Sequence, residues 1–236
     1  MDTTKKMGTS MFLRMYGITL TPADPSRFSL SALRTALSHA CAEYRAEHVD
    51  ARPPGTILSR YPPILCGQHG PALRITGLCQ GADVLWQIVD QKPEILDGTL
   101  RCHVDTRDAE IRCEPFGITD EEHEYEFITP WRALNQQNGK KFYLLQGKPS
   151  RDAFMQKLLT AQLNTLAKSL EYTPDRPITS SARVRFIRER IDRQTVMIFK
   201  GTFRTNLEIP QYLGIGQYVS QGSGWVQEIP PGAETS

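Results

Sequence analysis

Arginines gather in one short stretch near the C-terminal end of the chain, RVRFIRERIDR. They are Arg183, Arg185, Arg188, Arg190 and Arg193, and two acidic residues offset them only in part. If the stretch is a β-strand, Arg183 and Arg185 share one face, because successive strand residues alternate between faces. Lys200 and Arg204, on the expected partner strand, add to the positive charge. Such a cluster predicts binding to the phosphate backbone of RNA or DNA. The alternative is a solvated sheet face without a ligand.

Four glycines follow within eleven residues: Gly214, Gly216, Gly222 and Gly224. Glycine adopts positive φ readily, and successive free N–H groups in such a turn form a concavity that binds anions, phosphate above all. The segment GIGQYV lacks the third glycine of a dinucleotide-binding fingerprint, and the chain contains no GxxxxGK[ST] motif. The alternative interpretation is a glycine-rich turn before a last strand.

Histidine is the side chain best suited to general acid–base chemistry at neutral pH, and the chain has five. On the residues alone, His48 is an exposed loop histidine and His39 faces solvent from a helix. His123 lies in an acidic stretch, residues 120–126, that we interpret as a solvated loop. The five cysteines have no C-x-x-C spacing. We therefore expect buried free thiols, no metal site and no cofactor.

The composition describes a globular protein of 236 residues, with 39% hydrophobic and 23% charged residues. No apolar run reaches the length of a membrane span, and the N-terminus lacks the apolar core of a signal peptide. We therefore expect a cytoplasmic protein without a membrane partner. The net charge is only +2, so a nucleic-acid surface must come from local clustering.

Hydrophobic periodicity predicts the elements that position these residues. Strands are expected at residues 11–20, 61–66, 71–78, 95–104, 110–118, 182–191, 195–203 and 225–229. Helices are expected from residue 29 or 31 to 44, at 81–91, and at 150–170, with a helix or ordered turn at 131–143. The first β-α-β-β-α-β run is the ferredoxin-like motif. We predict an α+β protein of two tandem ferredoxin-like (RRM-like) domains, 11–105 and 106–229, with tails at 1–10 and 230–236.

Three sequence blocks resemble one known family. The arrangement G-h-G, five residues, G-x-G follows a strand reading FKGTF at residues 199–203, then Asn206 and Ile209-Pro210. It is similar to the signature of the CRISPR repeat-processing endoribonucleases, in the superfamily of tandem ferredoxin-like RNA-binding proteins. Residues 127–135, FITPWRALN, resemble the TPW.ALN element of one subgroup. Residues 61–64, YPPI, followed by ITGL and Gly81, resemble its YPLIQY…GI.EG region.

The resemblance implies roles for particular residues. This family places a catalytic histidine in the loop after the first helix, in one subgroup as a His-x-His pair. His48 matches that position as a single histidine, and His39 is the second candidate. Tyr44 could assist by hydrogen bonding. Arg52 or Arg60 could stabilise charge on the phosphorane.

The resemblance also implies a function. We expect a metal-independent endoribonuclease that binds CRISPR repeat RNA, often a hairpin, and cleaves the precursor to mature guide RNA. The products would be a 2′,3′-cyclic phosphate and a 5′-hydroxyl. The alternative is a catalytically silent subunit that holds guide RNA among other CRISPR effector subunits. A third option is an unrelated ferredoxin-like scaffold without a nucleic-acid role.

Overall fold

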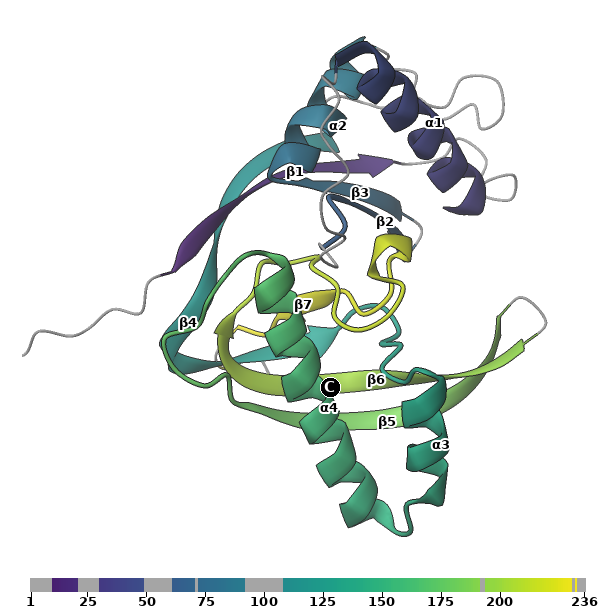
Figure 1. The fold of residues 1–236 in the computed structure, drawn as a ribbon, viewed down its shortest axis with the longest axis vertical. Helices are drawn as coiled ribbons and strands as arrows, with labels where there is room; N and C mark the ends of the chain where they lie inside the picture. The colour runs from purple at the N-terminus through teal and green to yellow at the C-terminus, as the bar shows by residue number, and fades with distance from the viewer. Residues whose placement is uncertain are drawn as a thin grey trace, which may run out of the picture. The chain divides into compact units, whose positions relative to one another are not determined.

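The computed structural model describes residues 10–20, 30–48, 61–70, 72–91, 108–191, 194–230 and 232. It has mixed α+β architecture with antiparallel strands (Figure 1). The chain divides into two compact units. The N-terminal unit comprises Leu13–Glu114 and Ser220–Gly222, and the C-terminal unit is built on Pro115–Val219 and the segment that begins at Ser223. The predicted domain boundary near residue 105 lies outside the described residues and stays a prediction.

The N-terminal unit follows the β-α-β-β-α-β order. Its elements are β1 (Met11–Leu20), α1 (Leu30–His48), β2 (Ile64–His69), β3 (Ala72–Leu78), α2 (Gln80–Gln91) and the start of β4 (Ala109–Phe127). The strands lie in the order β2-β3-β1-β4, and β3 pairs antiparallel with both β1 and β2. This is the strand order of the ferredoxin-like motif. The strand predicted at 95–104 lies outside the described residues, and the beginning of β4 occupies the fourth position.

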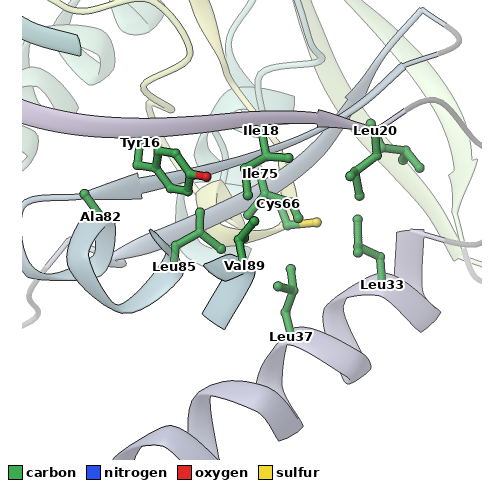
Figure 2. Close-up of a cluster of buried hydrophobic side chains, with 11 residues drawn as sticks. Tyr16, Ile18, Leu20, Leu33, Leu37, Cys66, Ile75, Ala82, Leu85 and Val89 are labelled. Carbon is green, nitrogen blue, oxygen red and sulfur yellow. The ribbon is translucent and has the colours of Figure 1, made fainter. Parts of the chain in front are cut away.

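Both helices of this unit cover the same face of its sheet (Figure 2). Leu33 and Leu37 of α1 are buried and lie one helical turn apart on the same side of the helix. They meet side chains from the sheet and α2, among them Ile18, Cys66, Ile75, Leu85 and Val89. Burying such aliphatic side chains contributes roughly 1.5–3 kcal/mol each. The core therefore fixes α1 and α2 against the sheet and leaves the outer face of α1 exposed.

The C-terminal unit repeats this strand order, but a glycine-rich connection replaces the second helix of the motif. Its elements are the rest of β4, α3 (Gln136–Leu144), α4 (Lys148–Ser169), β5 (Ser180–Ile191), β6 (Gln194–Glu208), the 3₁₀ turn η3 (Val219–Gln221) and β7 (Val226–Glu228). The strands lie in the order β7-β4-β6-β5. The glycine-rich connection between β6 and β7, described throughout, contains no α-helix where the motif has its second helix.

The long helix α4 packs against β5 (Figure 1). Pro149 stands at its start, where a missing N–H costs nothing. Its buried residues recur at helical spacing along one side: Met155, Leu159, Leu163, Leu166 and Ala167.

The acidic stretch at residues 120–126 is not the predicted loop. It belongs to β4, which runs through to Phe127 and pairs with β6 on either side of a register shift between Ile118 and His123. Tyr125 and Phe127 are buried while Glu126 between them is exposed. Strand alternation thus places Tyr125 and Phe127 in the core, although the stretch as a whole is strongly charged.

Within the described part of the chain, no helix is long and apolar enough to cross a membrane.

Candidate functional site

The basic hairpin of β5 and β6 brings like charges together. Arg183 pairs in register with Thr202, and Arg185 pairs with Lys200. All three cationic side chains are exposed. Residues directly opposite on antiparallel strands share a face and lie close together, and like charges in this arrangement destabilise the sheet. A bound polyanion such as a phosphate backbone would relieve that repulsion.

The other basic residues of the predicted cluster do not all join this face. Arg188 and Arg190 are exposed, but alternation along β5 directs them to the opposite face from Arg183 and Arg185. Arg204 is bound by Glu124, with Nε and Nη2 lying 3.0 and 2.8 Å from Oε2. These hydrogen bonds raise the pKa of the Arg204 guanidinium. The face shared by Arg183, Arg185 and Lys200 is therefore the best phosphate-binding candidate.

The glycine-rich segment uses many of its N–H groups internally. The N–H of Ile215 donates to Gly224 O (2.9 Å), and the N–H of Gly224 donates to Pro130 O (3.0 Å). The N–H of Ser223 donates to Tyr218 O (3.3 Å). These donors are consequently not available to an anion, although the sequence suggested an open concavity. A contact between the four glycines and RNA stays a prediction.

The glycines themselves meet steric requirements of the fold. A Cβ built on Gly224 (φ +67°) would overlap the carbonyl oxygen of Ile215, and one on Gly216 (φ +98°) would lie 2.8 Å from Trp131 Nε1. A Cβ on Gly222 (φ +79°) would overlap the Cα of Gly67. Positive φ and close backbone approach are both tolerated by glycine. Packing alone therefore explains these three glycines.

The TPWRALN element holds the glycine-rich segment in place. The Thr129 hydroxyl accepts the N–H of Trp225 (2.8 Å), and Pro130 O also accepts the Ser223 hydroxyl (2.9 Å). Trp131 is fully buried, and its indole N–H donates to Gln162 Oε1 of α4 (2.9 Å). The element ends at Asn135, whose side chain caps α3 by accepting the N–H of Asn138 (2.8 Å).

The YPPI and ITGL blocks are joined in a similar way in the N-terminal unit. The N–H of Leu78 donates to Pro63 O (2.8 Å). A Cβ on Gly81 would overlap the same carbonyl oxygen, and a Cβ on Gly77 would lie 2.5 Å from Gly81 O. Both glycines are therefore required where β3 turns into α2 against Pro63.

A pocket of about 380 Å³ lies in the N-terminal unit between α1, β2 and the tip of the glycine-rich segment. Its lining includes Arg34 and Ser38 of α1, and Ser220 and Gln221 of the segment. A guanidinium, two hydroxyls and an amide suit a phosphate or nucleotide group. We did not predict Arg34 or Ser38 from the sequence. Their spacing of one helical turn could have indicated that they share a face of α1.

The predicted catalytic residues lie on the same helix. His39 is exposed on α1. His48 is the last residue of α1 rather than part of the loop that follows, and Tyr44 is one turn earlier. The side chains of Tyr44 and His48 are outside the described part of the structure, as are Arg52 and Arg60 entirely. The catalytic assignments stay predictions.

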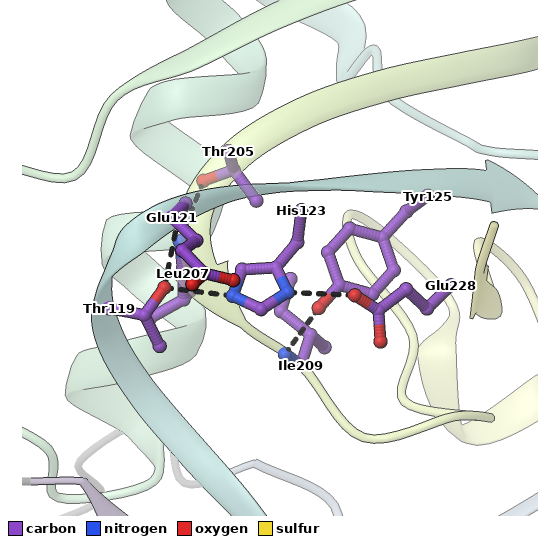
Figure 3. Close-up of polar contacts among 8 residues, drawn as sticks. All are labelled: Thr119, Glu121, His123, Tyr125, Thr205, Leu207, Ile209 and Glu228. Carbon is purple, nitrogen blue, oxygen red and sulfur yellow. Dashed lines mark hydrogen bonds and ion pairs between the residues drawn. The ribbon is translucent and has the colours of Figure 1, made fainter. Parts of the chain in front are cut away.

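His123 has a structural environment (Figure 3). Its Nε2 lies 2.8 Å from Thr119 Oγ1, and its Nδ1 lies 2.7 Å from Glu228 Oε1 of β7. The Thr119 hydroxyl donates its hydrogen to Glu121 O (3.0 Å), so it accepts from Nε2. With both nitrogens engaged, His123 joins β7 to the irregular part of β4 and is poorly placed to act as a general base.

Buried Tyr125 supports the same region. Its hydroxyl accepts the N–H of Ile209 (2.8 Å), and burial raises the pKa of this phenol. The hydrogen bond fixes the start of the glycine-rich connection beside β4.

The cysteines differ in exposure. Cys66 is buried as predicted, and burial raises the pKa of its thiol to about 12. Cys79 and Cys113 are exposed, in contrast to the prediction, and Cys41 is half-buried. Cys102 lies outside the described residues. Within the described ranges no three His, Cys, Asp or Glu side chains are grouped to hold a metal ion.

The fold defines a protein of two ferredoxin-like units, and solved structures share it. A crystal structure of the CRISPR RNA processing endoribonuclease Cas6b superposes with a TM-score of 0.68 at 24% identity, covering 93% of this chain and 100% of that one. A further Cas6b crystal structure gives 0.63 at 23% identity, with 93% and 100% covered. The predicted tandem ferredoxin-like fold class is confirmed.

Sequence comparison identifies the family. Residues 117–229 match the family model of the Cas6b C-terminal domain. An uncharacterized protein of Methanocaldococcus jannaschii is 30% identical over 122 residues, which are 51% of this chain and 82% of that protein. The chain therefore belongs to the Cas6b family.

Proposed function

We propose that this protein binds CRISPR repeat RNA and cleaves the precursor transcript to mature guide RNA by metal-independent acid–base chemistry. Family membership supports the substrate class. The observation that carries RNA binding is the exposed face on which Arg185 stands directly opposite Lys200, beside Arg183. In the register of β5 with β6, Arg183 lies opposite Thr202 and Arg185 lies opposite Lys200, so neither arginine is paired with an acidic residue there.

The pocket between α1 and Gln221 would be the site of the reaction. One face of α1 supplies Arg34 and Ser38 to the pocket, and the same helix carries His39 and His48. Arg34 would bind the scissile phosphate, where a guanidinium stabilises charge as it develops. A histidine would accept the proton of the 2′-hydroxyl as that oxygen attacks phosphorus. A separate group, acting as a general acid, would protonate the departing 5′-oxygen, leaving a 2′,3′-cyclic phosphate and a 5′-hydroxyl.

Single-turnover cleavage of end-labelled repeat RNA in EDTA tests the proposal. The wild-type protein should cut once, and an RNA with a 2′-deoxy sugar at the cut site should stay intact because the nucleophile is missing. His48→Ala should slow cleavage by about a hundred- to ten-thousand-fold with nearly unchanged affinity, which is typical of a lost general acid or base.

His39→Ala tests the second candidate, since it removes an exposed histidine from the same helix. If His39→Ala produces the large loss and His48→Ala does not, the catalytic role moves to His39. If the wild-type protein binds the repeat tightly and never cuts it, the enzyme proposal is wrong, and the protein is a silent guide-RNA-binding subunit. Cleavage that stops in EDTA and returns with added Mg²⁺ would refute metal independence.

A further inference from the structure

Tyr218, in the glycine-rich segment, combines exposure with an unfavourable backbone conformation. Its φ is +60°, and 47% of the residue is exposed. A residue with a Cβ pays roughly 1–2 kcal/mol in the left-handed region, which glycine does not. Tyr212 also has positive φ, but its ring packs edge-on against buried Trp225 at 5.8 Å. Tyr218 has no comparable core contact among the described ring pairs.

Arg132 orients the Tyr218 ring. The guanidinium carbon lies 3.8 Å from the ring centroid, which is the geometry of a stacked cation–π pair. Arg132 is itself held by its neighbours, because Trp131 beside it is fully buried and Arg132 O accepts the N–H of Gln217 (3.0 Å). The ring therefore has a cation against it, while nearly half of the residue stays accessible.

We propose that Tyr218, held by Arg132, is a stacking platform for one unpaired nucleobase of the bound RNA. This inference rests on the proposed function. An exposed aromatic ring beside a cation matches how proteins bind single-stranded nucleic acid: bases stack on the ring, and the cation attracts the phosphates. The strained backbone is then maintained because it presents the ring, in keeping with strain at ligand-binding positions.

Replacement by glycine separates binding from folding at this position. Tyr218→Gly removes the ring and also the left-handed penalty, so its melting temperature should equal or exceed that of the wild type. Its affinity for a repeat RNA with single-stranded flanks should fall about 5- to 150-fold, the range measured for loss of one base stack. Tyr218→Phe keeps the ring face and should retain affinity.

The position of the stacked base can be read directly. Repeat RNAs carrying 2-aminopurine at successive unpaired positions should show one position at which wild-type protein and Tyr218→Phe quench fluorescence and Tyr218→Gly does not. If Tyr218→Gly binds like the wild type, or if no unpaired position is quenched, the stacking inference is wrong while the proposed RNA binding stands. If Tyr218→Gly melts much earlier than the wild type, Tyr218 has a structural role and the inference is likewise wrong. If the wild-type protein binds no repeat RNA, the proposed function falls, and the inference with it.

Discussion

Gly224→Ala should destabilise the C-terminal unit strongly. Gly224 has φ +67°, and an added Cβ would overlap the carbonyl oxygen of Ile215. The left-handed conformation alone costs roughly 1–2 kcal/mol for alanine. Relieving the overlap would also disturb two backbone hydrogen bonds, Ile215 N–H to Gly224 O (2.9 Å) and Gly224 N–H to Pro130 O (3.0 Å). Each is worth about 1 kcal/mol net.

The expected loss in unfolding free energy is therefore about 3–4 kcal/mol. For a chain of this size, 1 kcal/mol shifts the melting temperature by about 2–4 °C, so a fall of roughly 6–16 °C should be seen by differential scanning calorimetry. Gly139→Ala is the matched control, because Gly139 lies in α3 with no atom within 4 Å of an added Cβ. Alanine favours the helix, so this variant should melt at the same temperature or higher.

A Gly224→Ala protein that melts within about 2 °C of the wild type, as an exposed surface substitution would, refutes a structural role for this glycine. Reduced RNA affinity in such a stable variant would instead support the sequence-based interpretation, in which the glycine-rich segment is an exposed ligand-binding loop.

Three further outcomes are expected. The affinity for repeat RNA should fall steeply with salt, and the double variant Arg183→Ala, Arg185→Ala should lower the slope of log K against log[salt] by about one or two. The control double variant Lys157→Ala, Lys168→Ala on α4 should leave the slope unchanged. An equal change in both double variants would remove the hairpin face from the binding surface. Burial raises the pKa of Glu110, but the hydrogen bond and charge of Arg74 outweigh it, so the folded pKa lies below its ordinary value near 4.5. The resulting stability is present above that value and is lost as the pH falls through the folded pKa. Urea titrations from pH 6 to 3 should therefore show a decline in the free energy of unfolding, and Glu110→Gln should make this decline less steep. An equally steep decline in Glu110→Gln would contradict the role of this carboxylate. Iodoacetamide at pH 8 should modify Cys79 and Cys113 in the native protein and Cys66 only after unfolding, as mass spectrometry of peptides can show; early labelling of Cys66 would contradict its burial.

Local patterns were sufficient for most elements. The bounds of β1 agree with the prediction, and the helix expected at 150–170 is α4, Lys148–Ser169. These segments carry apolar residues at the period of the element they form, and their ends carry turn residues or proline. The hairpin of β5 and β6 could be predicted for the same reason. The three sequence blocks were also sufficient to indicate the family.

Local patterns failed where partners distant in sequence decide the outcome. Residues 120–126 are mostly acidic, yet they belong to strand β4, and where the stretch pairs with β6 from His123 onward, Tyr125 is buried. The hydrophobic content of the stretch was too low to reveal this, because only one of its two faces meets the core.

The candidate site shows the same division. From the residue types, the sequence predicts that Arg183, Arg185 and Lys200 bind phosphate, since guanidinium and ammonium groups carry that chemistry wherever they are exposed. Only the tertiary structure shows that Arg185 faces Lys200 across the hairpin, while Glu124 engages Arg204. Register and ion pairing depend on contacts between separate strands, which spacing along one strand cannot specify.

The glycines make the point most clearly. Their spacing is equally compatible with an open anion-binding turn and with a packed segment, because both need positive φ. The carbonyl of Pro130, 94 positions before Gly224 along the chain, accepts the N–H of Gly224, and the backbone of Ile215 leaves no room for a Cβ. These contacts exist only in the folded chain, and they show that the segment is packed at Gly224, whereas a contact between the glycines and RNA stays a prediction.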